Sequence, residues 1–310
     1  MSSSTKALAL LLAGATVTAL TACSSSSEPN DEPSGSTGAG GGTVQVVAST
    51  NVYGDIAGQV GGDLVDVTSI ISDPSADPHS YEASAQTQLA LSEADLVIEN
   101  GGGYDDFVDT MLSALDQQPT VINAVEVSGK EEPADGELNE HVWYDFPTVV
   151  KVADAIADEL GTIDPDHADD YTANADAFTA KVEGLEQQVS ELAGTVGGEG
   201  VAITEPVPGY LLDALGLEDK TPEEFSEAIE EETDVPPAAL QATLDLFTNH
   251  EVVALVYNEQ TTGPETEQVL DAAQQAGVAV VPVTETLPEG EDYVSWMTGN
   301  VDALRTALGA

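Results

Sequence analysis

Basic residues are few in this chain. The 310 residues include 57 Asp and Glu but only 6 Lys and Arg, which gives a formal net charge of -51 at pH 7. Such a surface repels nucleic-acid phosphates and anionic headgroups, so nucleic acid is excluded as a partner. Hydrophobic residues make up 41% of the chain, enough for one large or two ordinary domains. We interpret the many acidic residues as a solvated surface adapted to high salt. At molar ionic strength the screening length is ~3 Å, which reduces the repulsion between these charges.

Several motifs with known chemistry are also missing. The sequence has no D-x-D-x-D-G calcium loop, no H-E-x-x-H, no G-x-S-x-G elbow and no phosphate-binding P-loop. We therefore predict that the protein is not an enzyme. A metal-dependent hydrolase remains the alternative, because a metal held by three protein ligands with one open position activates water.

The N-terminal region contains the only cysteine, Cys23, directly after an apolar segment over residues 7–20. That segment is too short to span a bilayer, so residues 1–22 are interpreted as a secretory signal. Leu20-Thr21-Ala22-Cys23 resembles the lipobox of bacterial lipoproteins, which implies cleavage before Cys23 and lipidation of its thiol. Ser, Gly, Pro and acidic residues dominate the next stretch, so residues 23–43 are predicted to be a lipidated flexible tether.

From Val44 onward, short β-branched runs alternate with helical patterns, which indicates parallel sheets covered by helices. The predicted strands occupy residues 44–48, 65–71, 95–99, 120–125, 201–204, 252–257 and 278–283. Between the two series, apolar residues recur every three or four positions from Tyr171 to Leu192, which predicts one long amphipathic helix. The fold class is therefore α/β: two parallel-sheet lobes, 44–165 and 197–310, bridged by one long helix over 166–196, with a cleft between them. Topology alone leaves a generic α/β enzyme with an accessory domain as the alternative.

Histidines and carboxylates follow the predicted strands. Ligands of open α/β sheets bind beyond the carboxyl ends of the strands, so these side chains are candidate ligands. They are His79 and His141 in the first lobe and Glu205, Glu259 and Glu285 in the second. The remaining two histidines, 167 and 250, stand at predicted helix ends, where a structural role explains them.

Two of these segments resemble the motifs of a known family. Asp77-Pro78-His79-Ser80-Tyr81-Glu82 and Glu140-His141-Val142-Trp143 resemble the first and second metal-binding motifs of the zinc and manganese solute-binding lipoproteins of ABC importers. The resemblance covers the chain from about Val44 to its C-terminus. It implies two lobes bridged by a helix, with one metal ion between them.

The family resemblance also implies a biological role. The protein would be anchored by lipid to the outer face of the cell membrane, capture a divalent transition metal, and deliver it to the permease of an ABC importer with its ATPase. A binding protein for an iron chelate or an organic solute on the same architecture is a further alternative.

The resemblance implies four ligands: His79, His141, Glu205 and Glu285. The third position in the family is usually histidine or glutamate, and Glu205 matches it. The fourth is usually aspartate after the last strand, where this chain has Glu285, with Glu259 as the competitor. Four side chains beside the histidines are predicted to orient the imidazole rings: Tyr81, Glu82, Trp143 and Asp145. For Trp143, plain packing is an equal explanation.

The expected cargo follows from this donor set. Two imidazoles and two carboxylates favour manganese, while zinc is a close second because it binds most such sites more tightly. Zinc-dedicated family members often carry a histidine-rich loop before the second motif. Residues 128–140 contain no histidine, which also favours manganese.

Overall fold

The computed structural model describes residues 43–73, 81, 84–133 and 138–310. The predicted signal, the predicted tether up to residue 42 with Cys23, the ligand candidate His79, and Glu82, which was predicted to orient a histidine ring, lie outside the described residues. Residues Gly41–Ala310 belong to one compact unit, and within its described part no helix is both long and apolar enough to cross a membrane.

Two parallel four-stranded sheets form the framework, which confirms the predicted fold class. The first contains β1 (Val44–Thr50), β2 (Val65–Ile71), β3 (Leu96–Glu99) and β4 (Thr120–Asn123) in the order β2-β1-β3-β4. The second contains β5 (Gly200–Ile203), β6 (Glu218–Asp219), β7 (Ala254–Asn258) and β8 (Ala279–Val283) in the order β6-β5-β7-β8. Both sheets thus place their first and third strands at the centre.

Helices cover both faces of each sheet. The first lobe contains α1 (Asn51–Gly61), α2 (Ala85–Glu93), α3 (Asp106–Leu112), α4 (Ala124–Ser128) and α5 (Phe146–Ile163), and the second α7 (Gly209–Ala214), α8 (Glu223–Glu230), α9 (Pro237–Thr248), α10 (Pro264–Ala276) and α11 (Tyr293–Ala307). Because successive strand residues point to opposite faces, Val46 and Ala48 join one buried cluster while Val47 joins another with α2 and α3. Both faces are therefore apolar, as buried parallel strands require.

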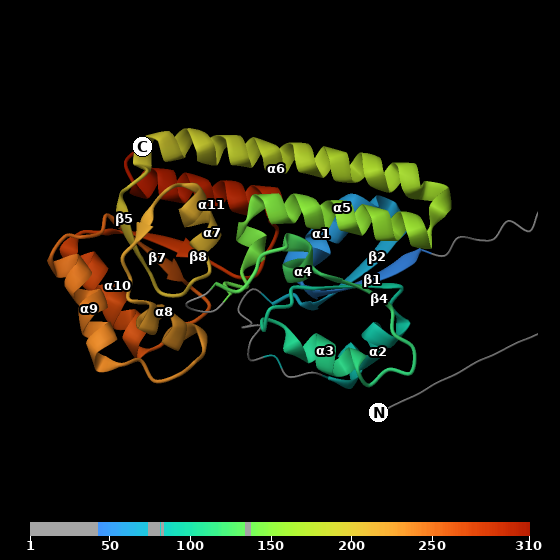
Figure 1. Cartoon of the computed structure of the whole chain (residues 1–310), viewed down its shortest axis with the longest axis horizontal. Helices are drawn as coiled ribbons and strands as arrows, with labels where there is room; N and C mark the ends of the chain where they lie inside the picture. Colours follow the sequence, from blue (N-terminus) through green and yellow to red (C-terminus); the bar gives the residue numbers. More distant parts are fainter. Residues whose placement is uncertain (1–42, 74–80, 82–83, 134–137) are drawn as a thin grey trace, which may run out of the picture. The chain divides into compact units, whose positions relative to one another are not determined.

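The predicted long helix is α6 (Ala168–Val196), with 29 residues. Its apolar stripe is buried throughout, at Tyr171, Ala175, Phe178, Val182, Leu185, Val189 and Leu192. It packs against α1 and α5 of the first lobe and α7 and α11 of the second (Figure 1). The helix begins two residues later than predicted, because Pro165–His167 form a separate 3₁₀ turn whose histidine ring contacts Asp164 at 2.7 Å.

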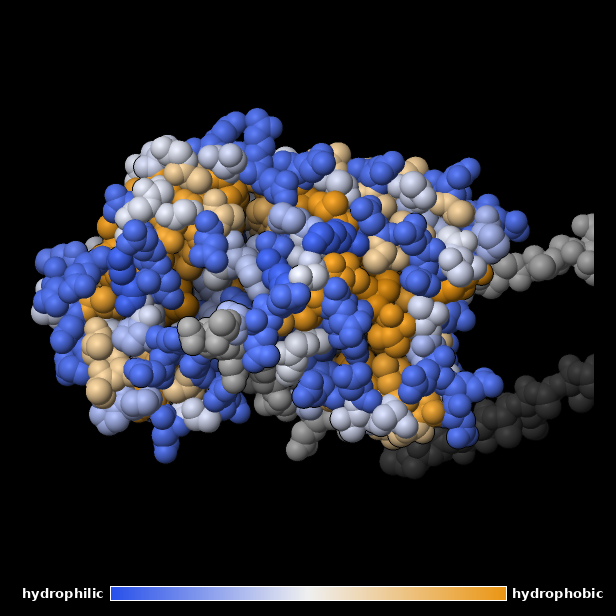
Figure 2. All heavy atoms as spheres, viewed as in Figure 1, coloured by the Kyte–Doolittle hydropathy of each residue, from blue (hydrophilic) through white to orange (hydrophobic). Residues whose placement is uncertain are grey.

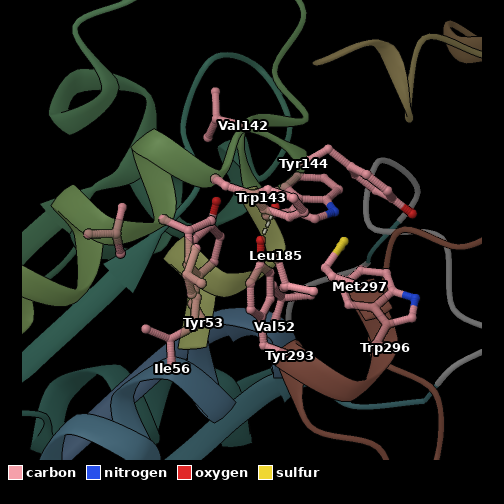
Figure 3. Packing of buried hydrophobic residues seen from close by; sticks show 14 of the residues in the cluster. Val52, Tyr53, Ile56, Val142, Trp143, Tyr144, Leu185, Tyr293, Trp296 and Met297 are labelled. Carbon is pink, nitrogen blue, oxygen red and sulfur yellow. Dashed lines mark hydrogen bonds between the residues drawn. The ribbon is translucent and has the colours of Figure 1, made fainter. Parts of the chain in front are cut away.

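Aromatic side chains join the two lobes. Trp143 and Tyr144, just before α5, pack with Tyr293, Trp296 and other residues of a cluster that continues through both lobes (Figure 3). The Tyr293 hydroxyl donates to the Trp143 carbonyl at 2.6 Å. On the outer face shown in Figure 2, hydrophilic residues are spread over both lobes with apolar residues between them.

Candidate metal site

His141 lies at the centre of the site, on the connection between α4 and α5. Its side chain is fully buried, and the 3₁₀ turn Val142–Tyr144 follows it directly. Asn139 Oδ1 accepts the His141 backbone N–H at 3.0 Å and lies 2.9 Å from His141 Nδ1. Since an amide oxygen only accepts, Nδ1 carries the ring proton. The lone pair of the neutral ring is then on Nε2, which is the atom that can bind a metal.

Asn139 also fixes the first lobe against the second. Its Nδ2 donates to the Pro206 carbonyl at 2.8 Å, and its own carbonyl accepts from the Tyr210 hydroxyl at 2.6 Å. Gly209 permits this approach, because a Cβ there would lie 2.7 Å from Asn139 Nδ2. One amide therefore sets the tautomer of His141 and ties it to the residue after Glu205. The sequence analysis missed this role.

Glu205 and Glu285 follow β5 and β8, at the same edge of the second sheet. Their side chains are only 3% and 2% exposed. Asn258, at the end of the intervening β7, donates from its backbone to Thr204 Oγ1 at 2.9 Å and from Nδ2 to Glu285 Oε1 at 2.8 Å. Because β7 lies between β5 and β8, Glu205 and Glu285 flank the end of β7, where Asn258 is located. Glu259, the predicted competitor, is exposed.

Hydrogen bonds connect the His141 segment to both of these carboxylate segments. Asn139 reaches Pro206, next to Glu205, as described above. At the other end, the Tyr144 hydroxyl donates to the carbonyl of Thr284, next to Glu285, at 2.8 Å. Residues 139–144, which we term the bridging segment, therefore contact the backbone beside two predicted ligands of the other lobe.

Tyr104 is a buried neighbour of His141. Its ring centre is 5.9 Å from that of His141, and its side chain is buried. Burial raises the pKa of Tyr104 well above its ordinary value, and the negative charges of Glu285, Asp105 and Glu230 raise it further. The phenol therefore stays protonated and can donate a hydrogen bond within this acidic environment.

Glu230 is a residue that the sequence analysis did not identify. It is the last residue of α8, and its Oε1 lies 3.3 Å from His141 Nε2. Together with Glu140, these side chains place one ligand atom each within 4.8 Å of one another, a separation that allows them to hold a metal ion. Candidate ligands were predicted from the residues that follow strands, and Glu230 was not among them because it ends a helix.

An acidic cavity of about 790 Å³ adjoins this group. Gly102, Asn139 and Pro206 line it near the bridging segment. Its carboxylates are Glu132, Glu140, Asp213, Asp219, Glu223, Glu227, Glu230 and Glu231, and none of the described lining residues is basic. Burial raises the pKa of Asp213 and of Asp219, as expected where acidic groups are partly removed from water.

The residues predicted to orient the histidines have other contacts. Trp143 packs edge to face with the His141 ring, with centres 5.0 Å apart, which agrees with the packing explanation. Tyr81 bonds Thr87 at 2.8 Å and its ring stacks near Phe107 in the first lobe. Asp145 caps α5 and pairs with Lys130 at 3.3 Å. Asn139, rather than these residues, forms the hydrogen bond to the His141 ring.

Comparison with known proteins places this geometry in a family. The chain is 27% identical over 285 residues to the manganese-binding lipoprotein MntA of Halalkalibacterium halodurans, which covers 86% of this chain and 88% of that protein. It is 24% identical to the zinc-binding lipoprotein AdcA of Streptococcus pneumoniae over 97% of this chain, but spans only 60% of that longer protein.

A solved structure supports the fold. The periplasmic zinc-binding protein TroA from Treponema pallidum superposes with a TM-score of 0.75 over 86% of this chain and 99% of its own, at 21% identity. The sequence model of the family described as ZnuA, zinc-uptake complex component A, periplasmic, matches residues 46–307. The chain therefore belongs to the ZnuA family of periplasmic zinc-uptake components.

Proposed function

We propose that the chain is the solute-binding subunit of an ABC importer, which captures a divalent transition metal outside the cytoplasm and passes it to a permease driven by an ATPase. The observation that carries this proposal is the fully buried His141, whose ring is oriented by Asn139 so that Nε2 faces a carboxylate of the opposite lobe. A buried imidazole with a fixed tautomer beside several carboxylates is typical of a metal site.

The proposed ligands remain His79, His141, Glu205 and Glu285. Burial of Glu205 and Glu285 at one sheet edge supports their assignment, because buried carboxylates need a positive partner or several hydrogen bonds. The exposure of Glu259 supports Glu285 over it as the fourth ligand. The contribution of His79 rests on its motif alone.

Manganese is the favoured cargo and zinc the second choice. The donor set is rich in carboxylate, which suits manganese, whereas additional imidazole would suit zinc. The relatives described above include one named for each metal, so the family name by itself does not fix the cargo. We further propose that the protein binds without catalysis, since its family consists of components of an uptake complex.

The proposal includes a membrane anchor at Cys23. The lipobox-like sequence around Cys23 and the polar tether after it support lipidation, and relatives named lipoproteins agree with this assignment. Mass spectrometry of membrane fractions should find an acylated N-terminal Cys23. An intact signal sequence or an unmodified secreted protein would contradict the anchor.

Metal analysis tests the binding function. Protein purified after expression with balanced manganese, zinc and iron should contain about one metal ion per chain, and His141→Ala should lose it while circular dichroism stays unchanged. His250→Asn is a matched control, because His250 follows α9, has a positive φ of 57° that asparagine tolerates, and is not among the proposed ligands. Full metal retention by His141→Ala would refute the proposal.

A further inference from the structure

We propose that Glu230 is a further metal ligand, contributed by α8, which makes the site selective for manganese over zinc. The inference rests on the proposed function, because it concerns the same cation and the same histidine. It adds a carboxylate to the ligands implied by the sequence motifs. Three observations support it: the distance to His141, the tautomer of that ring, and the position of Glu230 in the fold.

The first observation is the distance between the two ligand atoms. His141 Nε2 and Glu230 Oε1 are 3.3 Å apart. Two atoms that each lie ~2.1 Å from one metal ion, at an angle between ~90° and ~110°, are separated by roughly 3.0–3.4 Å. The pair therefore already has the spacing of adjacent ligands, so a cation can bind both atoms without a shift of either backbone.

The second observation is the chemistry of the pair. Asn139 Oδ1 lies 2.9 Å from Nδ1, which keeps the ring proton on Nδ1 and directs the lone pair of Nε2 towards Glu230. A carboxylate oxygen is also an electron-pair donor. Two donors that face each other in a buried place attract a cation, and Glu140, which lines the adjoining cavity, brings a third donor within 4.8 Å.

The third observation is the place of Glu230 in the fold. It ends α8, whose apolar face is buried through Phe225, Ala228 and Ile229, so the position of the helix end is set by packing in the second lobe. The side chain of Glu230 is only 10% exposed. Its carboxylate reaches across to the bridging segment of the first lobe, as a ligand between lobes must.

Selectivity follows from the number of ligands. Zinc in closed sites takes only four ligands, in a tetrahedron. Manganese accepts more oxygen ligands in octahedral geometry. An additional carboxylate therefore contributes more to the binding of manganese than to the binding of zinc.

The test compares Glu230→Gln with Glu231→Gln in the full chain. Both variants remove one negative charge from the end of α8 and from the same cavity, but Glu231 is exposed and does not face His141. Competition titrations with Mn²⁺ and Zn²⁺ against a metal-sensitive dye measure both affinities, and circular dichroism checks the fold. Electron paramagnetic resonance of bound Mn²⁺ reports its coordination directly.

Glu230→Gln should weaken Mn²⁺ binding by ~10- to 100-fold or more, the range found when a group supporting a ligand is lost. Zn²⁺ should lose less, and the Mn²⁺ spectrum should change. Glu231→Gln should leave the ratio of the two affinities and the spectrum unchanged. Equal effects of the two variants, or equal losses for both metals, would overturn the inference. If the wild type bound neither metal, the proposed function itself would fail.

Discussion

Replacing Asn139 by alanine removes three hydrogen bonds at the junction of the lobes. The lost contacts are Nδ2 to the Pro206 carbonyl at 2.8 Å, and Oδ1 to the His141 backbone N–H at 3.0 Å and to Nδ1 at 2.9 Å. At ~1 kcal/mol for each bond, the free energy of unfolding should fall by about 3 kcal/mol. Urea unfolding of the metal-free protein measures this loss.

The same change should impair metal binding by a separate route. Without Asn139 Oδ1, His141 can place its proton on Nε2, the nitrogen that must bind the metal. Loss of a group that orients a metal-bound histidine typically costs ~10- to 100-fold in affinity, so we expect a decrease in this range for both Mn²⁺ and Zn²⁺. Isothermal calorimetry on the folded variant measures it.

Asn174→Ala is the matched control for this prediction. Asn174 Nδ2 donates to the Val60 carbonyl at 2.9 Å and joins α6 to α1 in the first lobe. Its loss should cost ~1 kcal/mol of stability and leave metal affinity unchanged. If Asn139→Ala bound metal as tightly as the wild type, the role assigned to the amide would be wrong, whatever its stability.

Three further changes have defined outcomes. Glu205→His exchanges a carboxylate for an imidazole, so competition titration should show zinc gaining relative to manganese; an unchanged ratio would place Glu205 outside the ligands. Gly209→Ala puts a Cβ 2.7 Å from Asn139 Nδ2 and should cost ~1–3 kcal/mol in urea unfolding, where a neutral result would contradict the contact. Burial raises the pKa of Glu99 from 4.5 to about 7, so its protonated form stabilises the fold at low pH. That contribution, at most about 3 kcal/mol, is lost as pH rises from about 4.5 through 7, and Glu99→Gln should show a flatter pH dependence of stability.

The regular elements were predictable because their apolar periods are clear. The long helix and the strand over 65–71 follow from spacing alone, and the other strands differ by one or two residues at their ends. The helix α5, with 18 residues, was not predicted, because it lies between the last strand of the first lobe and the long helix, outside the alternation of strands and helices. The two-residue strand β6 carries no periodic signal at all.

The candidate site was predictable only where the proposed ligands follow strands. Glu205 and Glu285 stand after β5 and β8, so topology brings them to one edge. Glu230 reaches His141 through the packing of α8, which depends on contacts far apart in the sequence. Asn139 directly precedes the second motif, yet its role depends on Pro206 of the other lobe. The roles of Glu230 and Asn139 therefore depend on tertiary packing, which the local sequence pattern does not contain.

The bridging segment anchors itself to main-chain atoms of the second lobe. Asn139 and Tyr144 bond the carbonyls of Pro206 and Thr284, which neighbour Glu205 and Glu285 but are not their side chains. Substitution at either glutamate therefore leaves these anchors in place. If Glu205 and Glu285 hold the metal as proposed, a lineage can exchange these carboxylates for other side chains over evolutionary time, and so change its preferred cargo, without rebuilding the scaffold that positions them.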